Sequence, residues 1–154
     1  MFRRAACLAA LALSALAGEP GLRSYDRVEI APTKTSIYIG SVSMTMPPFT
    51  RAAGGAYEST YVAKVFPFFF NSEHGRLSVE FSDEALRKLE RGERVAFTGR
   101  AVATSGDERR IEGHATPAAP GAPTGKIKVR VFVSRSVELI FNTTYAFPAS
   151  SSKP

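Results

Sequence analysis

Hydrophobic and polar residues alternate along most of the chain with a period of two, which is typical of half-buried β-strands. Between residues 57 and 81, the odd positions are mostly large and apolar, whereas the even positions are mostly polar or charged. The same alternation recurs in residues 36–46, 93–104, 107–115, 126–133 and 137–147. If residues 57–81 form a hairpin of two strands, the pattern predicts about seven strands in total.

One aromatic run breaks this alternation. Four of the five residues from Phe66 to Phe70 are phenylalanines, so both faces of the strand are apolar there. Such a strand is either buried on both sides or offers one face to a partner. Residues 71–75 contain turn formers and a glycine, which predicts a hairpin loop. We expect a core strand followed by this hairpin; the alternative is an edge contact through Phe66, Phe68 and Phe70, which Pro67 favours because it cannot donate to a ladder.

A single short helix is predicted after the hairpin, at residues 82–92. Ser82 is suited to cap its first turn, and Gly92 is suited to end it in the left-handed conformation. Ala85, Leu86 and Leu89 form an apolar stripe along one face. A helix of about nine residues is marginal alone, so it should pack on the sheet or close the end of a barrel.

These elements predict the fold class and the domain limits. Residues 116–124 contain too much proline for a strand and read as a surface connection. Three strands, a helix and two strands is also the order of elements in an OB-fold. We therefore predict one all-β domain over residues 35–147 with one short helix, either a small OB-like barrel extended by two strands or a two-sheet sandwich. Residues 18–34 are expected to be loosely ordered and residues 148–154 to form a flexible tail.

The N-terminus has the features of a secretory signal peptide. Arg3 and Arg4 precede an apolar run, and Ala15-Leu16-Ala17 supplies the pattern that signal peptidase reads, so residues 1–17 are the predicted signal peptide. The run is shorter than the about 20 apolar residues of a membrane-spanning helix, and no later stretch is long enough. The one cysteine, Cys7, lies within this segment, so the mature chain would hold by burial without disulfides. We expect an exported protein, periplasmic or extracellular.

Charge geometry suggests a surface for anionic partners. The formal net charge of +6 becomes +4 without the two arginines of the signal peptide, and that value alone identifies no partner. Strand alternation, however, places Lys126, Lys128 and Arg130 on one outward face, and Arg94 and Arg100 on the outward face of another strand. An anionic envelope polymer or lipid head groups would suit such a surface. Export argues against nucleic acid as a physiological target, and the alternative explanation is an ordinary solvated strand face.

Candidate catalytic groups are few. Glu73 and His74 lie in the predicted loop and form a pair of residue types used in acid-base chemistry. His114, with Glu112, could join His74 as a zinc ligand. No nucleophile at a recognisable spacing completes a catalytic set. A small hydrolase therefore requires the fold to bring Glu73, His74 and His114 into one cleft.

The Met44-Thr45-Met46 pattern points to a different chemistry. Two thioethers at i and i+2 share one strand face, which suits soft ions such as Cu(I). The pattern resembles that of small periplasmic copper-binding proteins with an OB-fold, which pair Met-x-Met with a histidine and a tryptophan. The resemblance implies a metal site at Met44, Met46 and His74. This chain has no tryptophan, and core packing of the methionines is the favoured interpretation.

We therefore predict an exported, non-catalytic binding or structural module of the cell envelope that uses no cofactor. Its expected partner is an anionic envelope polymer or another envelope protein. The alternatives are a periplasmic copper-binding protein and a small hydrolase. An assembly subunit would be favoured if residues 66–70 formed an exposed edge.

Overall fold

The computed structural model describes residues 25–149, so the predicted signal peptide at residues 1–17 lies outside the described residues. The described chain is mostly β-structure, with one α-helix, α1 (Asp83–Glu90), and one short 3-10 turn, η1 (Phe69–Asn71). The strands are β1 (Arg27–Ile30), β2 (Thr33–Ile37), β3 (Gly40–Thr45), β4 (Phe49–Arg51), β5 (Ala56–Phe66), β6 (Glu73–Glu80), β7 (Val95–Ala103), β8 (Glu108–Pro117), β9 (Thr124–Phe132) and β10 (Glu138–Ala146).

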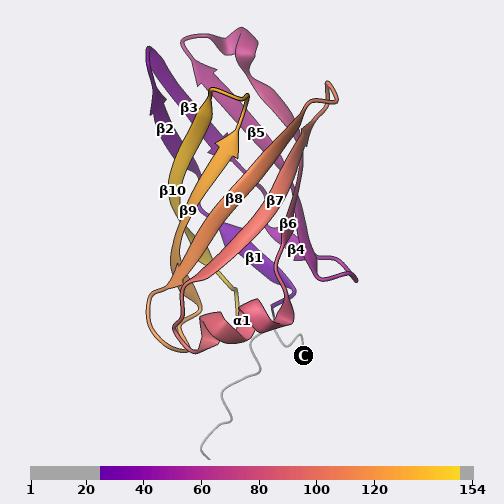
Figure 1. The fold of residues 1–154 in the computed structure, drawn as a ribbon, viewed down its shortest axis with the longest axis vertical. Helices are drawn as coiled ribbons and strands as arrows, with labels where there is room; N and C mark the ends of the chain where they lie inside the picture. The colour runs from indigo at the N-terminus through magenta and orange to yellow at the C-terminus, as the bar shows by residue number, and fades with distance from the viewer. Residues whose placement is uncertain (1–24, 150–154) are drawn as a thin grey trace, which may run out of the picture.

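These ten strands form a closed eight-stranded antiparallel barrel, shown in Figure 1, because β1 and β2 share one position in the wall and β3 and β4 share the next. From β5 to β10, each strand pairs with the next one along the chain. β3 and β4 both pair with β5, and β1 closes the ring between β4 and β10. The predicted all-β class with one short helix is confirmed, and of the two architectures considered the barrel is the one observed.

The first strands of the barrel begin before residue 35, earlier than the alternation of apolar residues predicts. β1 and the first two residues of β2 lie within residues 18–34, which we had assigned to a loosely ordered segment. Val28 is buried in the core, and Ile30 packs against it from the same strand face. Two alternating apolar residues are too short a pattern to distinguish from chance, so this part of the wall was not predicted.

The inward-facing residues agree with the predicted alternation. On β9, the odd positions between the outward-facing Lys126, Lys128 and Arg130 line the hollow of the barrel, and the odd positions of β10 line it too. Tyr61 of β5 and Phe141 of β10 are the most completely buried large side chains of the described chain. The apolar core is therefore a ring of side chains around the inside of the wall.

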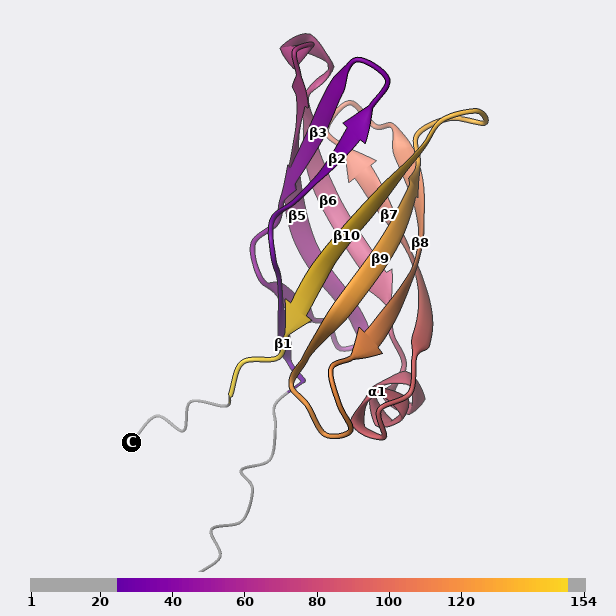
Figure 2. The same cartoon turned by 90° about the vertical axis from the view of Figure 1, so that its left-hand side faces the viewer.

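The helix closes one end of this barrel, at the bottom of Figures 1 and 2. The Ser82 hydroxyl accepts a hydrogen bond from the Ala85 N–H at 3.1 Å, and Gly92 has a φ of +85°, as expected for the two ends. Leu86 and Leu89 are buried, so the apolar stripe faces the interior. No helix within residues 25–149 is long and apolar enough to cross a membrane.

The aromatic run lies outside the core, which corrects our expectation of a core strand. β5 ends at Phe66, and β6 begins at Glu73, so the connection spans residues 67–72 and not residues 71–75. Phe66, Phe69 and Phe70 are exposed. β5 pairs with β3 as far as Phe66 but with β6 only as far as Ala63. Residues 67–70 belong to the connection after β5, so they form no edge strand either. They extend beyond the end of the wall, where no opposing strand remains to cover them.

Candidate functional site

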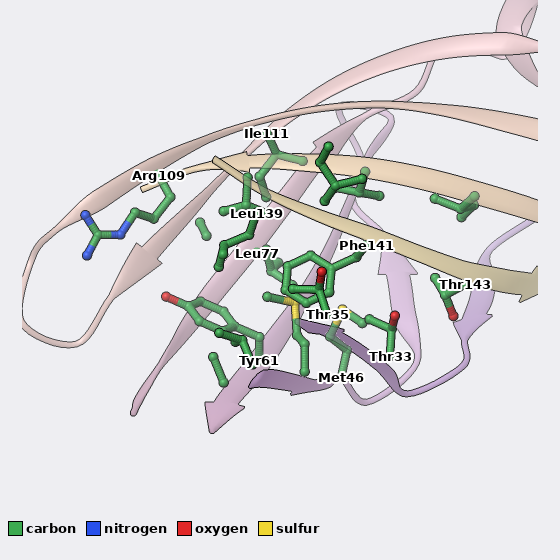
Figure 3. A pocket seen from close by; sticks show the side chains of 18 of the residues that line it. Thr33, Thr35, Met46, Tyr61, Leu77, Arg109, Ile111, Leu139, Phe141 and Thr143 are labelled. Atoms are coloured by element: carbon green, nitrogen blue, oxygen red, sulfur yellow. The ribbon is translucent and has the colours of Figure 1, made fainter. Parts of the chain in front are cut away.

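The barrel contains a cavity of about 1020 Å³. Its lining extends from Leu89 of α1 to the loops at the opposite end of the barrel, where Ile39 and Asn71 contribute to it. Most of the lining is aliphatic or aromatic, and Figure 3 shows Leu77, Ile111 and Phe141 among its side chains. An eight-stranded barrel is either filled by its own side chains or holds one small ligand. Ligand sites commonly measure about 300–1,000 Å³, so this cavity has room for a small molecule.

A polar cluster lies inside the wall near the open end. The Tyr61 hydroxyl donates a hydrogen bond to Glu73 Oε1 at 2.9 Å, and Arg109 Nη2 donates to Glu73 Oε2 at 3.3 Å. Arg109 also donates through Nη1 to the Val133 carbonyl at 3.1 Å and lies 3.8 Å from Asp107 Oδ2. The Arg109 and Glu73 side chains are 19% and 31% exposed, so both remain accessible from the cavity mouth. Figure 3 shows Tyr61 and Arg109 at the same end of the pocket.

The electrostatics of this cluster favour a protonated Tyr61 and an Arg109 whose charge is balanced by carboxylates. Burial raises the pKa of Tyr61 well above its usual range, and the hydrogen bond to Glu73 raises it further. Glu73, Glu138 and Arg109 are the charged residues in the cavity lining, and Asp107 lies beside the guanidinium. The positive charge of Arg109 is thus already balanced by these carboxylates.

One seam in the barrel wall has few backbone hydrogen bonds. The ladder between β1 and β10 ends at a bond of 3.0 Å from the Ala31 N–H to the Thr144 carbonyl. Beyond the end of this ladder, Thr33 Oγ1 donates to the Asn142 carbonyl at 3.0 Å, and Thr143 Oγ1 donates to the Ala31 carbonyl at 2.7 Å. Within residues 25–149, β2 and β10 share no ladder pair, although both line the cavity. The wall is therefore held by side chains at this seam.

The basic residues singled out in the sequence lie on the outside of the barrel, away from the cavity. Lys126, Lys128 and Arg130 are exposed along β9, Arg94 is exposed just before β7, and Arg100 is exposed in the middle of β7. Arg100 pairs with a carboxylate, Glu108, at 3.4 Å, and Arg130 lies opposite Glu112 of β8. Lys126 and Lys128 make no ion pair with any residue in the described part of the chain.

The barrel does not bring the candidate catalytic and metal-binding residues together. Glu73 and His74 are consecutive on β6, so Glu73 faces the cavity whereas His74 is exposed on the outer face. His114 lies on the outer face of β8, with β7 between the two histidines. The cleft that a hydrolase would require at Glu73, His74 and His114 is therefore not formed.

The barrel wall also separates the two methionines from His74. Met44 and Met46 are half-buried, pack against the core and line the cavity. His74, the third residue of the proposed copper site, lies on the other side of the wall. Within residues 25–149, no group of three or more histidine, cysteine or acidic side chains is arranged to hold a metal ion.

Sequence reasoning missed Arg109 as a site residue and misplaced Glu73 in a loop. The alternation of apolar and polar positions contained evidence that both side chains face the interior. Arg109 precedes the inward-facing Ile111 by two positions, and Glu73 precedes Gly75 and Leu77 on the same strand parity. A charged residue on the apolar parity of a strand needs an internal partner. Two such residues of opposite sign would have suggested an internal ion pair.

The chain matches no protein family model, no curated protein and no solved structure. Its candidate site is therefore interpreted from geometry alone. That geometry combines an apolar cavity, a charge-balanced polar cluster near the open end and a seam held by side chains.

Proposed function

We propose that this protein is a non-catalytic binding module that holds one small, largely apolar molecule inside the barrel. The cavity of about 1020 Å³, apolar through most of its depth and floored by α1, is the observation that carries the proposal. Burying an apolar ligand releases about 25 cal/mol per Å² of apolar surface removed from water, so such a cavity favours ligands of this class. Both histidines lie outside the cavity, which supports binding without chemistry.

The polar cluster indicates a neutral polar end on the ligand. A hydroxyl or amide group can donate to Glu73 and accept from Arg109 without disturbing their ion pair. A carboxylate would instead compete with Glu73 for Arg109, in a mouth that already contains Glu138. We therefore propose that a long-chain alcohol or amide binds more tightly than the matching acid at neutral pH.

The place of action is proposed from the sequence. The predicted signal peptide over residues 1–17 supports export, and the barrel would then act in the cell envelope or outside the cell. A module that carries or stores a poorly soluble molecule is useful there, because such molecules cross aqueous space slowly when unaccompanied.

Fluorescence titration with a polyene fatty alcohol and with the corresponding acid tests cavity binding. A matched pair of variants locates the ligand: Ala101→Phe places a phenyl ring in the cavity, whereas Val102→Phe places it on the outer face of the same strand. We expect the alcohol to bind the wild-type protein and Val102→Phe with one site per chain. Ala101→Phe should lower the affinity at least tenfold.

Equal affinity in the two variants would contradict binding inside the barrel. Tighter binding of the acid than of the alcohol would contradict the assignment of a neutral head group while leaving the cavity proposal in place. Circular dichroism and urea unfolding of each variant establish that a loss of binding does not come from a loss of folding.

The basic outer face supports a second candidate function, namely binding of an anionic envelope polymer. Lys126 and Lys128 lie next to each other on the outward side of β9, without an ion pair among the described residues. Replacing both by serine should weaken binding to a polyanion such as teichoic acid or heparin, and 0.5 M salt should weaken it in the wild type. Polyanion binding that is unaffected by both changes would contradict this second function.

A further inference from the structure

An exposed apolar cluster lies at the open end of the barrel. We call it the rim cluster: Tyr38, Ile39, Phe66, Phe69 and Phe70. The exposed fractions are 107% for Tyr38, 67% for Ile39, 58% for Phe66, 63% for Phe69 and 83% for Phe70. Side chains of this size are rarely left so exposed together unless they contact a partner or a membrane.

The rim cluster is one surface although it comes from two connections. Ser41 pairs with Phe66, so the β2–β3 turn lies against the end of β5. Gly40 makes this approach possible, because a Cβ at that position would lie 1.9 Å from the Phe66 carbonyl oxygen. The rings of Phe66 and Phe69 meet edge to face with centroids 5.7 Å apart. Figures 1 and 2 both show the two connections at the barrel end opposite α1.

The rim cluster is continuous with the mouth of the cavity. Tyr38 and Ile39 belong both to the cluster and to the cavity lining, and Asn71 carries the lining into the β5–β6 connection. Whatever covers the rim cluster therefore lies beside the passage that a ligand must use. An apolar ligand is stored mainly in lipid, so a lipid phase at this position would be its direct source.

Two lysines lie behind the rim cluster on the outer face of the wall. Lys34 and Lys64 flank Ser43 in one cross-strand row, and both are exposed. Neither makes an ion pair among residues 25–149. At about 3.3 Å per strand residue, they stand about 7–10 Å behind the ends of β2 and β5. Anionic phosphates of a bilayer would meet them at this depth when the apolar tips enter the acyl boundary.

We propose that the rim cluster docks onto a lipid bilayer with anionic head groups, so that the cavity mouth opens toward the acyl region. Two contributions drive the binding of a protein to a membrane surface. Apolar side chains enter the boundary between head groups and acyl chains by about 5–10 Å, and basic side chains are attracted to anionic lipids. A bilayer accommodates protruding tips of unequal height, whereas a protein partner would need a complementary surface around an open mouth. This docking rests on the proposed function for its purpose, but it is measurable independently.

Vesicle flotation tests the docking with matched variants of the full chain. In the test variant, Phe69→Ser is combined with Phe70→Ser, because neither phenylalanine lines the cavity. The control is Val62→Ser, which removes an exposed apolar side chain, 43% exposed, from the side of the barrel. Every protein carries the same N-terminal segment, so any membrane affinity of that segment cancels in the comparison.

We expect the wild type and Val62→Ser to float with vesicles of phosphatidylcholine and phosphatidylglycerol. The double phenylalanine variant should partition about tenfold more weakly for each ring removed. Lys34→Ser with Lys64→Ser should weaken binding to the anionic vesicles several-fold and leave binding to pure phosphatidylcholine unchanged.

Equal flotation of the double phenylalanine variant and the Val62→Ser control would overturn the docking proposal. A second result would also overturn it: the wild-type protein does not bind vesicles but forms dimers, and the phenylalanine substitutions disrupt these dimers. The partner of the rim cluster would then be a second copy of the chain. Fluorescence titration with the polyene alcohol separates this result from cavity binding: all rim variants should keep the wild-type affinity. Vesicle binding without probe binding would refute the cavity proposal and leave the docking in place.

Discussion

Replacing Glu73 by leucine should destabilise the barrel, because one carboxylate serves two buried or half-buried partners. The Tyr61 side chain is 2% exposed and would lose its acceptor, and an unsatisfied buried hydroxyl costs about 1–3 kcal/mol. The ion pair with Arg109 at 3.3 Å has a gross attraction of about 5 kcal/mol at an effective dielectric constant of 20. Because both partners are partly exposed and Arg109 keeps the Val133 carbonyl, the net loss from the pair is about 1 kcal/mol.

The expected total for Glu73→Leu is therefore about 2–4 kcal/mol of unfolding free energy. Glu73→Gln is the matched control, since its amide oxygen still accepts from Tyr61 and only the charge is lost, and about 1 kcal/mol is expected. Urea unfolding followed by circular dichroism measures both values, with equal slopes required for the comparison. A loss of less than 0.5 kcal/mol in Glu73→Leu would show that the cluster contributes no stability and refute this reasoning.

The same Glu73→Gln variant also tests ligand selectivity. Removing the negative charge leaves Arg109 with weaker competition from the protein, so a fatty acid should gain affinity relative to the matching alcohol. The ratio of the two dissociation constants, measured by probe titration in wild type and variant, reports this change. An unchanged ratio would mean that the ligand head group does not reach the Glu73–Arg109 pair.

Three further predictions concern pH and local geometry. Burial raises the pKa of Tyr57 to about 12, above the unfolded value of about 10. Its stabilising contribution is therefore complete below pH 10 and lost as pH rises from 10 to 12. The urea midpoint, measured across this pH range, should fall less steeply with pH in Tyr57→Phe than in the wild type, and an equally steep fall would contradict this. Gly40→Ala should destabilise the barrel by more than 1 kcal/mol in urea unfolding, because the Cβ would overlap the Phe66 carbonyl; a neutral effect would contradict the close approach. Ser82→Ala should cost about 0.5–2 kcal/mol by thermal unfolding through loss of the helix cap, and an unchanged midpoint would show that the cap does not contribute.

Local patterns were sufficient to predict most of the barrel. Alternation is a property of each strand taken singly, so the outward faces of β7 and β9 were predicted correctly without knowledge of the neighbouring strands. The helix was predicted equally well, because Ser82 and Gly92 act within one or two turns of themselves. Both kinds of signal depend on residues close together in sequence.

The features that depend on distant partners were not predictable in the same way. Glu73 and Arg109 are 36 residues apart in sequence, and only barrel closure places them together. The aromatic run has the composition of a buried strand, and its exposure follows from where β5 and β6 end relative to their neighbours. The odd-numbered positions of Glu73 and Arg109 nevertheless indicated that both side chains face inward. A charged side chain on the inward face requires a partner inside the barrel.

Native mass spectrometry after incubation with a neutral long-chain alcohol tests binding in the barrel most directly. The protein is expected to retain one alcohol molecule per chain, with retention reduced at least tenfold in Ala101→Phe and unchanged in Val102→Phe. A folded protein that retains no alcohol, or that retains it equally in both variants, would contradict a ligand-binding cavity.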